Sequence, residues 1–229
     1  MKIKNLFFLF CILIFNFSNI LAQNVEERNI EDFDRIDASG YFDIYLSKGD
    51  KPSLKVESKH LGLDEIITRV SGTTLRIEST RHRFRNEERS TIYITYTNIK
   101  EIYASVAGNI IGESPIQGEK LRIEMSGAGN VELEVEVQQL DLRLSGVGNL
   151  EITGKTKDLE VDMSGTGAFR GFKLKAENAE VFMSGVGKAQ VYATESLTAE
   201  TTGIGSIRYR GSPKQIRARA NFLGSVKPD

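Results

Sequence analysis

The chain has 229 residues, of which 40% are hydrophobic and 27% charged, a composition typical of a globular protein with a substantial core. Its 30 basic and 31 acidic residues give a net charge of −1, so no overall positive field attracts nucleic acid or an anionic membrane. Many glycines (21) with few prolines (4) indicate recurring tight corners rather than disordered linkers.

Residues 1–22 have the pattern of a secretory signal peptide. Lys2 and Lys4 precede an apolar stretch, and Ala22 supplies a small residue for cleavage. We therefore expect export to the periplasm, the cell surface or the medium, with a retained N-terminal anchor as the alternative. The only cysteine, Cys11, lies in this segment, so we expect no disulfide and no thiolate metal site in the mature chain. No later segment is apolar enough to cross a membrane.

After a short leader at residues 23–32, residues 33–104 predict an irregular, strand-rich part. Phe42–Leu46 and Thr91–Tyr96 alternate between apolar and polar residues, as strands with one buried face do. One short helix is expected within 61–70, because Leu63, Ile66, Ile67 and Val70 would share a helical face. This part is predicted to cap the repeats that follow, since the ends of a repeat stack expose strand edges.

Residues 105–229 contain a Ser-Gly-x-Gly motif about every 19 residues, which is the signature of a solenoid. Four copies are complete, one has Thr in place of Ser, and degraded copies begin at Ser105 and Asn221. The corner residues expected from the five clear copies are Ser126, Gly127, Gly129, Ser145, Gly146, Gly148, Ser164, Gly165, Gly167, Ser184, Gly185, Gly187, Thr202, Gly203 and Gly205.

Short alternating strands flank each corner, and no helical pattern separates them. Two such strands cannot close a core, whereas stacked coils can, so the fold class is all-β, a β-solenoid or parallel β-helix. One inward column is expected to fill the core and to narrow toward the C-terminus: Met125, Leu144, Met163, Met183, Thr201 and Ala220. Outward charges are expected to pair between coils, with Arg122 beside Asp141 and Glu124 beside Arg143.

The residues of the Ser-Gly-x-Gly motif are those expected of a structural turn between coils. Glycine permits positive φ and a close approach of successive coils, and the leading hydroxyl can hydrogen-bond to its neighbouring copy. Asn109, Asn130 and Asn149 follow three corners and are expected to form an asparagine ladder. A strand follows each glycine pair, which excludes a P-loop, and no Asp stands at the spacing of a calcium β-roll. We therefore expect no cofactor and no metal.

The opening pattern Phe33-x-x-Ile36-x-x-Ser39-Gly40-x-Phe42-x-Ile44, followed by the serial corners, resembles the bacterial auto-transporter adhesin family with a head GIN domain. The resemblance covers residues 33–212 of a family also catalogued as a domain of unknown function. It implies a β-helix related to pectin-lyase-like folds and a role in adhesion, and it supplies no catalytic motif.

These observations favour an exported, non-enzymatic envelope or cell-surface protein, an adhesin-like module that binds an envelope or host glycan or protein. Two alternatives stay open. One is a carbohydrate-active enzyme of the β-helix type, for which Glu132, Glu134 and Glu136 would supply carboxylates. The other is a structural envelope component that acts through assembly. A charged cluster at Arg81–Arg89 is interpreted as an exposed loop rather than a site for acidic glycan or nucleic acid.

Overall fold

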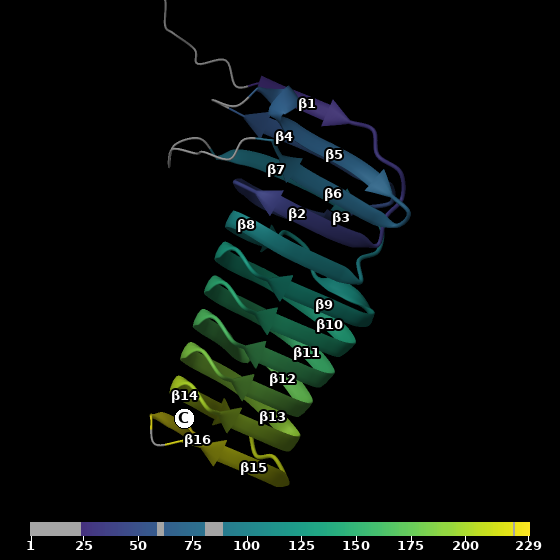
Figure 1. The fold of residues 1–229 in the computed structure, drawn as a ribbon. Coiled ribbons are helices and arrows are strands. Elements are labelled where there is room, and N and C mark those ends of the chain that lie inside the picture. Colours follow the sequence, from purple (N-terminus) through teal and green to yellow (C-terminus); the bar gives the residue numbers. More distant parts are fainter. Residues whose placement is uncertain (1–23, 59–61, 81–88, 222) are drawn as a thin grey trace, which may run out of the picture.

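The computed structural model describes residues 24–58, 62–80, 89–221 and 223–229 (Figure 1). The expected signal peptide and most of the charged cluster lie outside the described residues. The protein is a β-solenoid of about seven turns with about 19 residues per turn, and strands make up 78% of it. The fold class predicted from the repeat is therefore confirmed. In the described part of the chain, no helix has the length and apolar character needed to cross a membrane.

The N-terminal part combines parallel coil strands with antiparallel pairs that extend the stack beyond them. Strands β2 and β3 form the first coil, and β2 and β3 both pair in parallel with β8. The elements are β1 (Asn24–Arg28), β2 (Arg35–Gly40), β3 (Phe42–Lys48), β4 (Ser53–Ser58), the 3₁₀ helix η1 (Leu63–Glu65), β5 (Ile66–Ser71), β6 (Thr74–Ser79) and β7 (Ser90–Tyr96).

The expected helix within 61–70 is wrong beyond its first turn. Residues 66–71 form β5, which pairs antiparallel with β6 across a tight turn at Gly72, where φ is +62°. Ile66, Thr68 and Val70 alternate with more exposed residues, so a period of two fits this segment as well as a helical period. The Ser-Gly-Thr turn signal and the tertiary pairing decide in favour of the hairpin.

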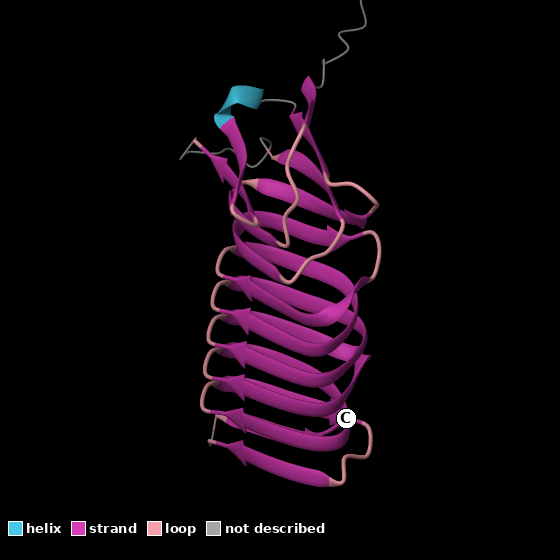
Figure 2. Ribbon diagram, turned by 90° about the vertical axis from the view of Figure 1, so that its right-hand side faces the viewer, coloured by secondary structure: helices cyan, strands magenta, loops and turns pink. Residues whose placement is uncertain are grey.

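The C-terminal part stacks its coils in parallel, with equivalent residues in register. Its strands are β8 (Glu101–Gly112), β9 (Ile116–Met125), β10 (Ala128–Leu144), β11 (Val147–Met163), β12 (Thr166–Met183), β13 (Val186–Thr201), β14 (Ile204–Arg210), β15 (Gln215–Ala220) and β16 (Gly224–Pro228). Figure 2 shows the turns between successive coils lined up along one edge of the stack.

Each central coil is a single long strand rather than the two short strands expected. In β10 and β11 the pairing continues from Val137–Thr156 to Gln139–Asp158, past the bend at Gln138. Because neighbouring coils bend at the same place, their hydrogen bonds continue around it. We call residues 128–137 and their equivalents the post-corner face, and residues 139–144 and their equivalents the pre-corner face.

The predicted inward column fills the core except at its last position. Met125, Leu144, Met163, Met183 and Thr201 are each at most 2% exposed, whereas Ala220 is exposed. All residues of β15 are likewise exposed, because no described strand covers the side of β15 that faces away from β13.

The corners bring successive backbones into contact. A Cβ on Gly146 would lie 2.0 Å from the carbonyl oxygen of Gly127, and one on Gly148 would lie 1.7 Å from that of Gly129. The second glycine of four corners also has φ between +148° and +158°. Because side chains larger than hydrogen cannot fit, the glycine pair is a condition for stacking.

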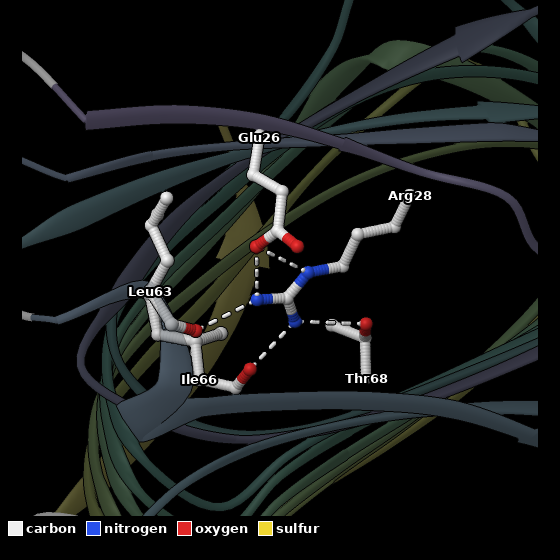
Figure 3. Close-up of polar contacts among 5 residues, drawn as sticks. All are labelled: Glu26, Arg28, Leu63, Ile66 and Thr68. Atoms are coloured by element: carbon white, nitrogen blue, oxygen red, sulfur yellow. Dashed lines mark hydrogen bonds and ion pairs between the residues drawn. The ribbon is translucent and has the colours of Figure 1, made fainter.

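Arg28 ties the two sides of the N-terminal cap together (Figure 3). Its guanidinium donates to the carbonyl oxygens of Leu63 (2.7 Å) and Ile66 (2.5 Å), to Oγ1 of Thr68 (3.0 Å) and twice to the Glu26 carboxylate. The side chain is only 16% exposed. All five N–H donors are thereby used, which joins β1 to η1 and β5 over the first coil.

The corner geometry predicts that Gly146→Val lowers the free energy of unfolding by about 3 kcal/mol or more, because valine would displace the Gly127 carbonyl. Thermal unfolding followed by circular dichroism measures this. Gly118→Ala is the control, since a Cβ there meets nothing within 4 Å. An unchanged melting temperature for Gly146→Val would contradict the assignment of the corner as scaffold.

The cap geometry predicts that Arg28→Leu destabilises the protein by about 1–3 kcal/mol, because two carbonyl groups and a carboxylate lose their donor. Arg28→Lys should recover only part of this, since an ammonium has three donors instead of five. Denaturant unfolding compares both with Arg69→Leu, an arginine of β5 whose side chain is 57% exposed. Equal stability of Arg28→Leu and Arg69→Leu would disprove the clamp.

Candidate functional site

The corner hydroxyls point into solvent and do not form the expected ladder. Ser126, Ser145, Ser164 and Ser184 are exposed, and among the described residues no hydrogen bond joins one corner hydroxyl to another. Backbone bonds hold the corner instead. In the second copy, for example, the amide of Ser145 donates to Met125 (3.0 Å) and that of Val147 to Gly127 (2.9 Å). The corner therefore positions the residues beside it.

The asparagine ladder follows directly after the corners, on the post-corner face. Nδ2 of Asn149 donates to Oδ1 of Asn130 (2.7 Å), and Nδ2 of Asn130 donates to Oδ1 of Asn109 (3.0 Å). Each of these three amides uses one of its two N–H donors inside the ladder, and among the described residues the second donor has no protein partner. The register of the coils fixes these groups one strand spacing apart, about 4.8 Å.

Asp43 closes the ladder at its N-terminal side, and the sequence analysis missed it. Its Oδ1 accepts from the backbone amide (2.8 Å) and the side chain (3.0 Å) of Asn109 and lies 3.5 Å from Nη1 of Arg89. Asp43 is 66 residues from Asn109 in the chain. The sequence feature that could have indicated Asp43 is Ser39-Gly40, a partial corner motif just before it. In the structure Ser39 pairs with Ser105, where the degraded corner begins.

The ladder ends at Asn149, because the equivalent residue of the next coil is Ala168. Among the described residues, Oδ1 of Asn149 accepts no hydrogen bond. An open hollow of about 480 Å³ lies on this surface. The asparagine ladder lines it together with Glu132, Glu151 and Arg170. The result is a rigid polar surface that mixes amide, carboxylate and guanidinium groups.

A stacked column of side chains borders the asparagine ladder on the N-terminal side. The rings of Tyr45 and Tyr93 lie 5.2 Å apart with an interplanar angle of 20°, and Nζ of Lys55 lies 4.2 Å from the centre of the Tyr93 ring. Burial, and then the Glu57 carboxylate, raise the pKa of Tyr93 above its usual range. The Tyr93 ring therefore contacts both Tyr45 and Lys55, and its hydroxyl donates to the Glu57 carboxylate (3.4 Å).

The carboxylates considered for catalysis are not gathered into one site. Glu132 borders the hollow, while Glu136 pairs with Lys155 (3.2 Å) and accepts from Gln117 (3.2 Å). The hydrogen bond from Lys155, and then that from Gln117, lower the pKa of Glu136. Glu134 is exposed between them on the same strand. The described part of the chain holds no group of three or more His, Cys, Asp or Glu residues placed to bind a metal ion.

Among the described residues, the two expected charge pairs stand in register, but neither forms an ion pair. Arg122 stands opposite Asp141, and Arg143 opposite Glu124. The Asp141 carboxylate instead contacts Lys120 (3.0 Å), while Arg122 turns along its own strand to Glu124 (3.2 Å). Long side chains reach diagonal neighbours on a sheet, which the direct register does not predict.

An aliphatic row crosses the corners at the variable position of the motif. It consists of Val147, Val186, Ile204 and Leu223, whose exposed fractions are 60%, 47%, 52% and 50%. Val147, Val186 and Ile204 each have glycine on both sides in the sequence, so no adjacent side chain along the chain covers them. Thr166 occupies the same motif position between Val147 and Val186.

A parallel β-solenoid with glycine corners and a polar outer ladder defines a class of rigid repeat proteins with extended surfaces. The chain belongs to the family described as "Putative auto-transporter adhesin, head GIN domain", whose model matches residues 32–213. The resemblance found in the sequence is thereby confirmed. No curated protein matches the chain.

Solved structures of similar fold come from species of Bacteroides and Parabacteroides. A "putative adhesin" from Bacteroides fragilis is 27% identical, with a TM-score of 0.85, and the match covers 91% of this chain and 97% of that one. A "putative lipid binding protein" from Parabacteroides distasonis is also 27% identical, with a TM-score of 0.68 and coverage of 90% and 96%. A "putative adhesin" from Parabacteroides merdae, at 23% identity and a TM-score of 0.70, shares the fold.

The end of the ladder predicts that Ala168→Asn stabilises the protein by about 0.5–1 kcal/mol, because a new amide could donate to the free Oδ1 of Asn149. Ala168→Asp is the matched control, since its carboxylate has nearly the same shape but no donor at neutral pH. Denaturant unfolding measures both. Equal stability of the two variants would show that the ladder does not extend by one rung.

Proposed function

We propose that the protein is an exported, non-enzymatic binding module of the cell envelope or surface, and that it holds a glycan on the asparagine ladder. The observation that carries this proposal is the row of ladder amides at fixed spacing, each with one N–H donor that has no partner among the described residues. A polymer of repeating hydroxyl-bearing units can accept from such donors at successive coils. Because the scaffold fixes the amides before binding, little conformational entropy is lost when a ligand is held.

The lowered pKa of Glu136 disfavours this carboxyl group as a catalytic acid. A glycosidase needs a carboxylic acid whose pKa is raised, so that it carries a proton near neutral pH. Of the described carboxyl groups, the two with a resolved pKa shift are Asp34 and Glu136, and both pKa values are lowered by hydrogen bonds from lysine. These groups stay ionised and act as acceptors.

Export and adhesion are supported by different observations. The pattern of residues 1–22 is that of a secretory signal, and the family and two of the solved structures carry adhesin in their descriptions. A solenoid with polar faces offers the extended surface that binding to a polymer or a protein requires.

A glycan array probed with the chain from residue 23 onward tests this function, followed by calorimetry on any ligand retained. Asn149→Ala should weaken binding by about 3–10-fold, because it removes one donor and one acceptor next to the hollow. Alanine already occupies the equivalent place in the next coil, so the fold should tolerate it.

Asn178→Ala is the matched control, because Asn178 makes similar rung-to-rung hydrogen bonds, with Asp158 and Ser196, on the pre-corner face. Two outcomes would overturn the proposal. One is equal weakening by both variants. The other is binding to phosphatidylcholine vesicles in place of glycans, lost on Ile204→Ser, which would assign the function to the aliphatic row.

A further inference from the structure

The two ends of the solenoid differ in how their outermost strands are paired and covered. At the N-terminal end, antiparallel strands and the Arg28 clamp cover the first coil (Figure 3). At the C-terminal end, β15 pairs only with β13 and β16 only with β14. Within the described residues, no strand takes the second edge of β15, so a row of backbone N–H and C=O groups faces outward.

The core is also left open at this end. Ile216, Ala218 and Ala220 continue the columns of Leu197, Ala199 and Thr201, which are each 1% exposed. All six residues of β15 are themselves exposed, and Ile216 is 47% exposed. Burying these side chains under one more strand would be favourable, because it would remove apolar surface from water.

The outward side chains of β15 carry positive charge. Arg217 and Arg219 alternate with the aliphatic residues, and among the described residues neither takes part in an ion pair. Nearby Arg210 and Lys214, by contrast, are paired with Asp229 and Glu195. A hollow of about 480 Å³ lies beside the two free arginines and is also lined by Thr198, Glu200, Ile216 and Ala218.

The charge pattern disfavours a second copy of this chain as the occupant. Antiparallel pairing of β15 with itself about Ala218 keeps the aliphatic residues on one side. It then sets Arg217 of each copy opposite Arg219 of the other. Like charges directly opposite in a sheet are destabilising, and charged residues are a common protection of free edges.

We propose that β15 is a docking edge for an extended acidic segment of a partner protein, which adds one strand to the pre-corner face. The partner's backbone would pair with the free edge, its acidic residues would meet Arg217 and Arg219, and its aliphatic residues would cover Ile216 and Ala218. Alternating acidic and aliphatic residues satisfy all three requirements. This inference is independent of the glycan proposal, which concerns the other face.

A peptide with this alternation tests the edge directly. The probe is fluorescently labelled Val-Glu-Leu-Glu-Val-Glu-Val, the sequence of residues 131–137, and its control replaces each Glu by Lys. Fluorescence anisotropy with the full chain should detect the acidic peptide only. Arg217→Glu combined with Arg219→Glu should weaken binding at least tenfold, while Lys173→Glu combined with Lys175→Glu, on the post-corner face, should not. Equal binding of both peptides, or of both double variants, would overturn the proposal.

A charge exchange provides a second readout that needs no peptide. Arg217→Glu alone makes the edge self-complementary, because each new carboxylate would face Arg219 of a second copy. Analytical ultracentrifugation should therefore show the wild type as a monomer, Arg217→Glu as a dimer, and the double Glu variant as a monomer again. A wild-type dimer that Arg217→Glu dissolves would identify a second copy as the occupant. If the Arg217→Glu variant stays monomeric, the edge of β15 does not accept another strand and the proposal is wrong.

Discussion

The backbone contact between successive coils at the glycine corner is the constraint on which this structure depends. A Cβ at either glycine of a corner would approach a carbonyl oxygen of the preceding coil to between 1.7 and 2.1 Å. With hydrogen in that place, the coils come close enough for in-register hydrogen bonds along strands of 16 to 18 residues. The interior columns of Met, Leu and Val follow from that register, since each inward residue packs on its equivalent one coil away.

The same register has consequences on the outside of the molecule. Equivalent residues become neighbours, so asparagines that are about 20 residues apart in the chain form hydrogen bonds and Asp43 joins them from a distant segment. The corners also leave the aliphatic row, at the variable position of the motif, exposed to solvent. The polar ladder lies on β8, β10 and β11, while the apolar row begins at β11 and continues toward the C-terminal end, so the two surfaces follow one another along the solenoid and offer different ligand chemistry on one rigid support.

A stack of coils has two ends, and each end is a free edge that has to be covered or protected. Here the chain closes one end with antiparallel strands and five hydrogen bonds from one arginine. At the other end only the charges of β15 protect the open core. The two ends therefore differ in kind, because one carries antiparallel strands and the Arg28 clamp and the other ends on the exposed strand β15.

The sequence by itself determined the solenoid, its corners and the asparagine ladder, because a repeat of about 19 residues forces equivalent residues into the same place in every coil. Local pattern failed at Ile66–Ser71, where helical spacing and strand alternation coincide and pairing with β6 decides. The contact of Asp43 with Asn109, the five bonds of Arg28 and the openness of β15 were decided only by the tertiary structure. Each depends on residues that are distant in the chain, or on the absence of a following coil in the described structure, and periodicity carries no information about either.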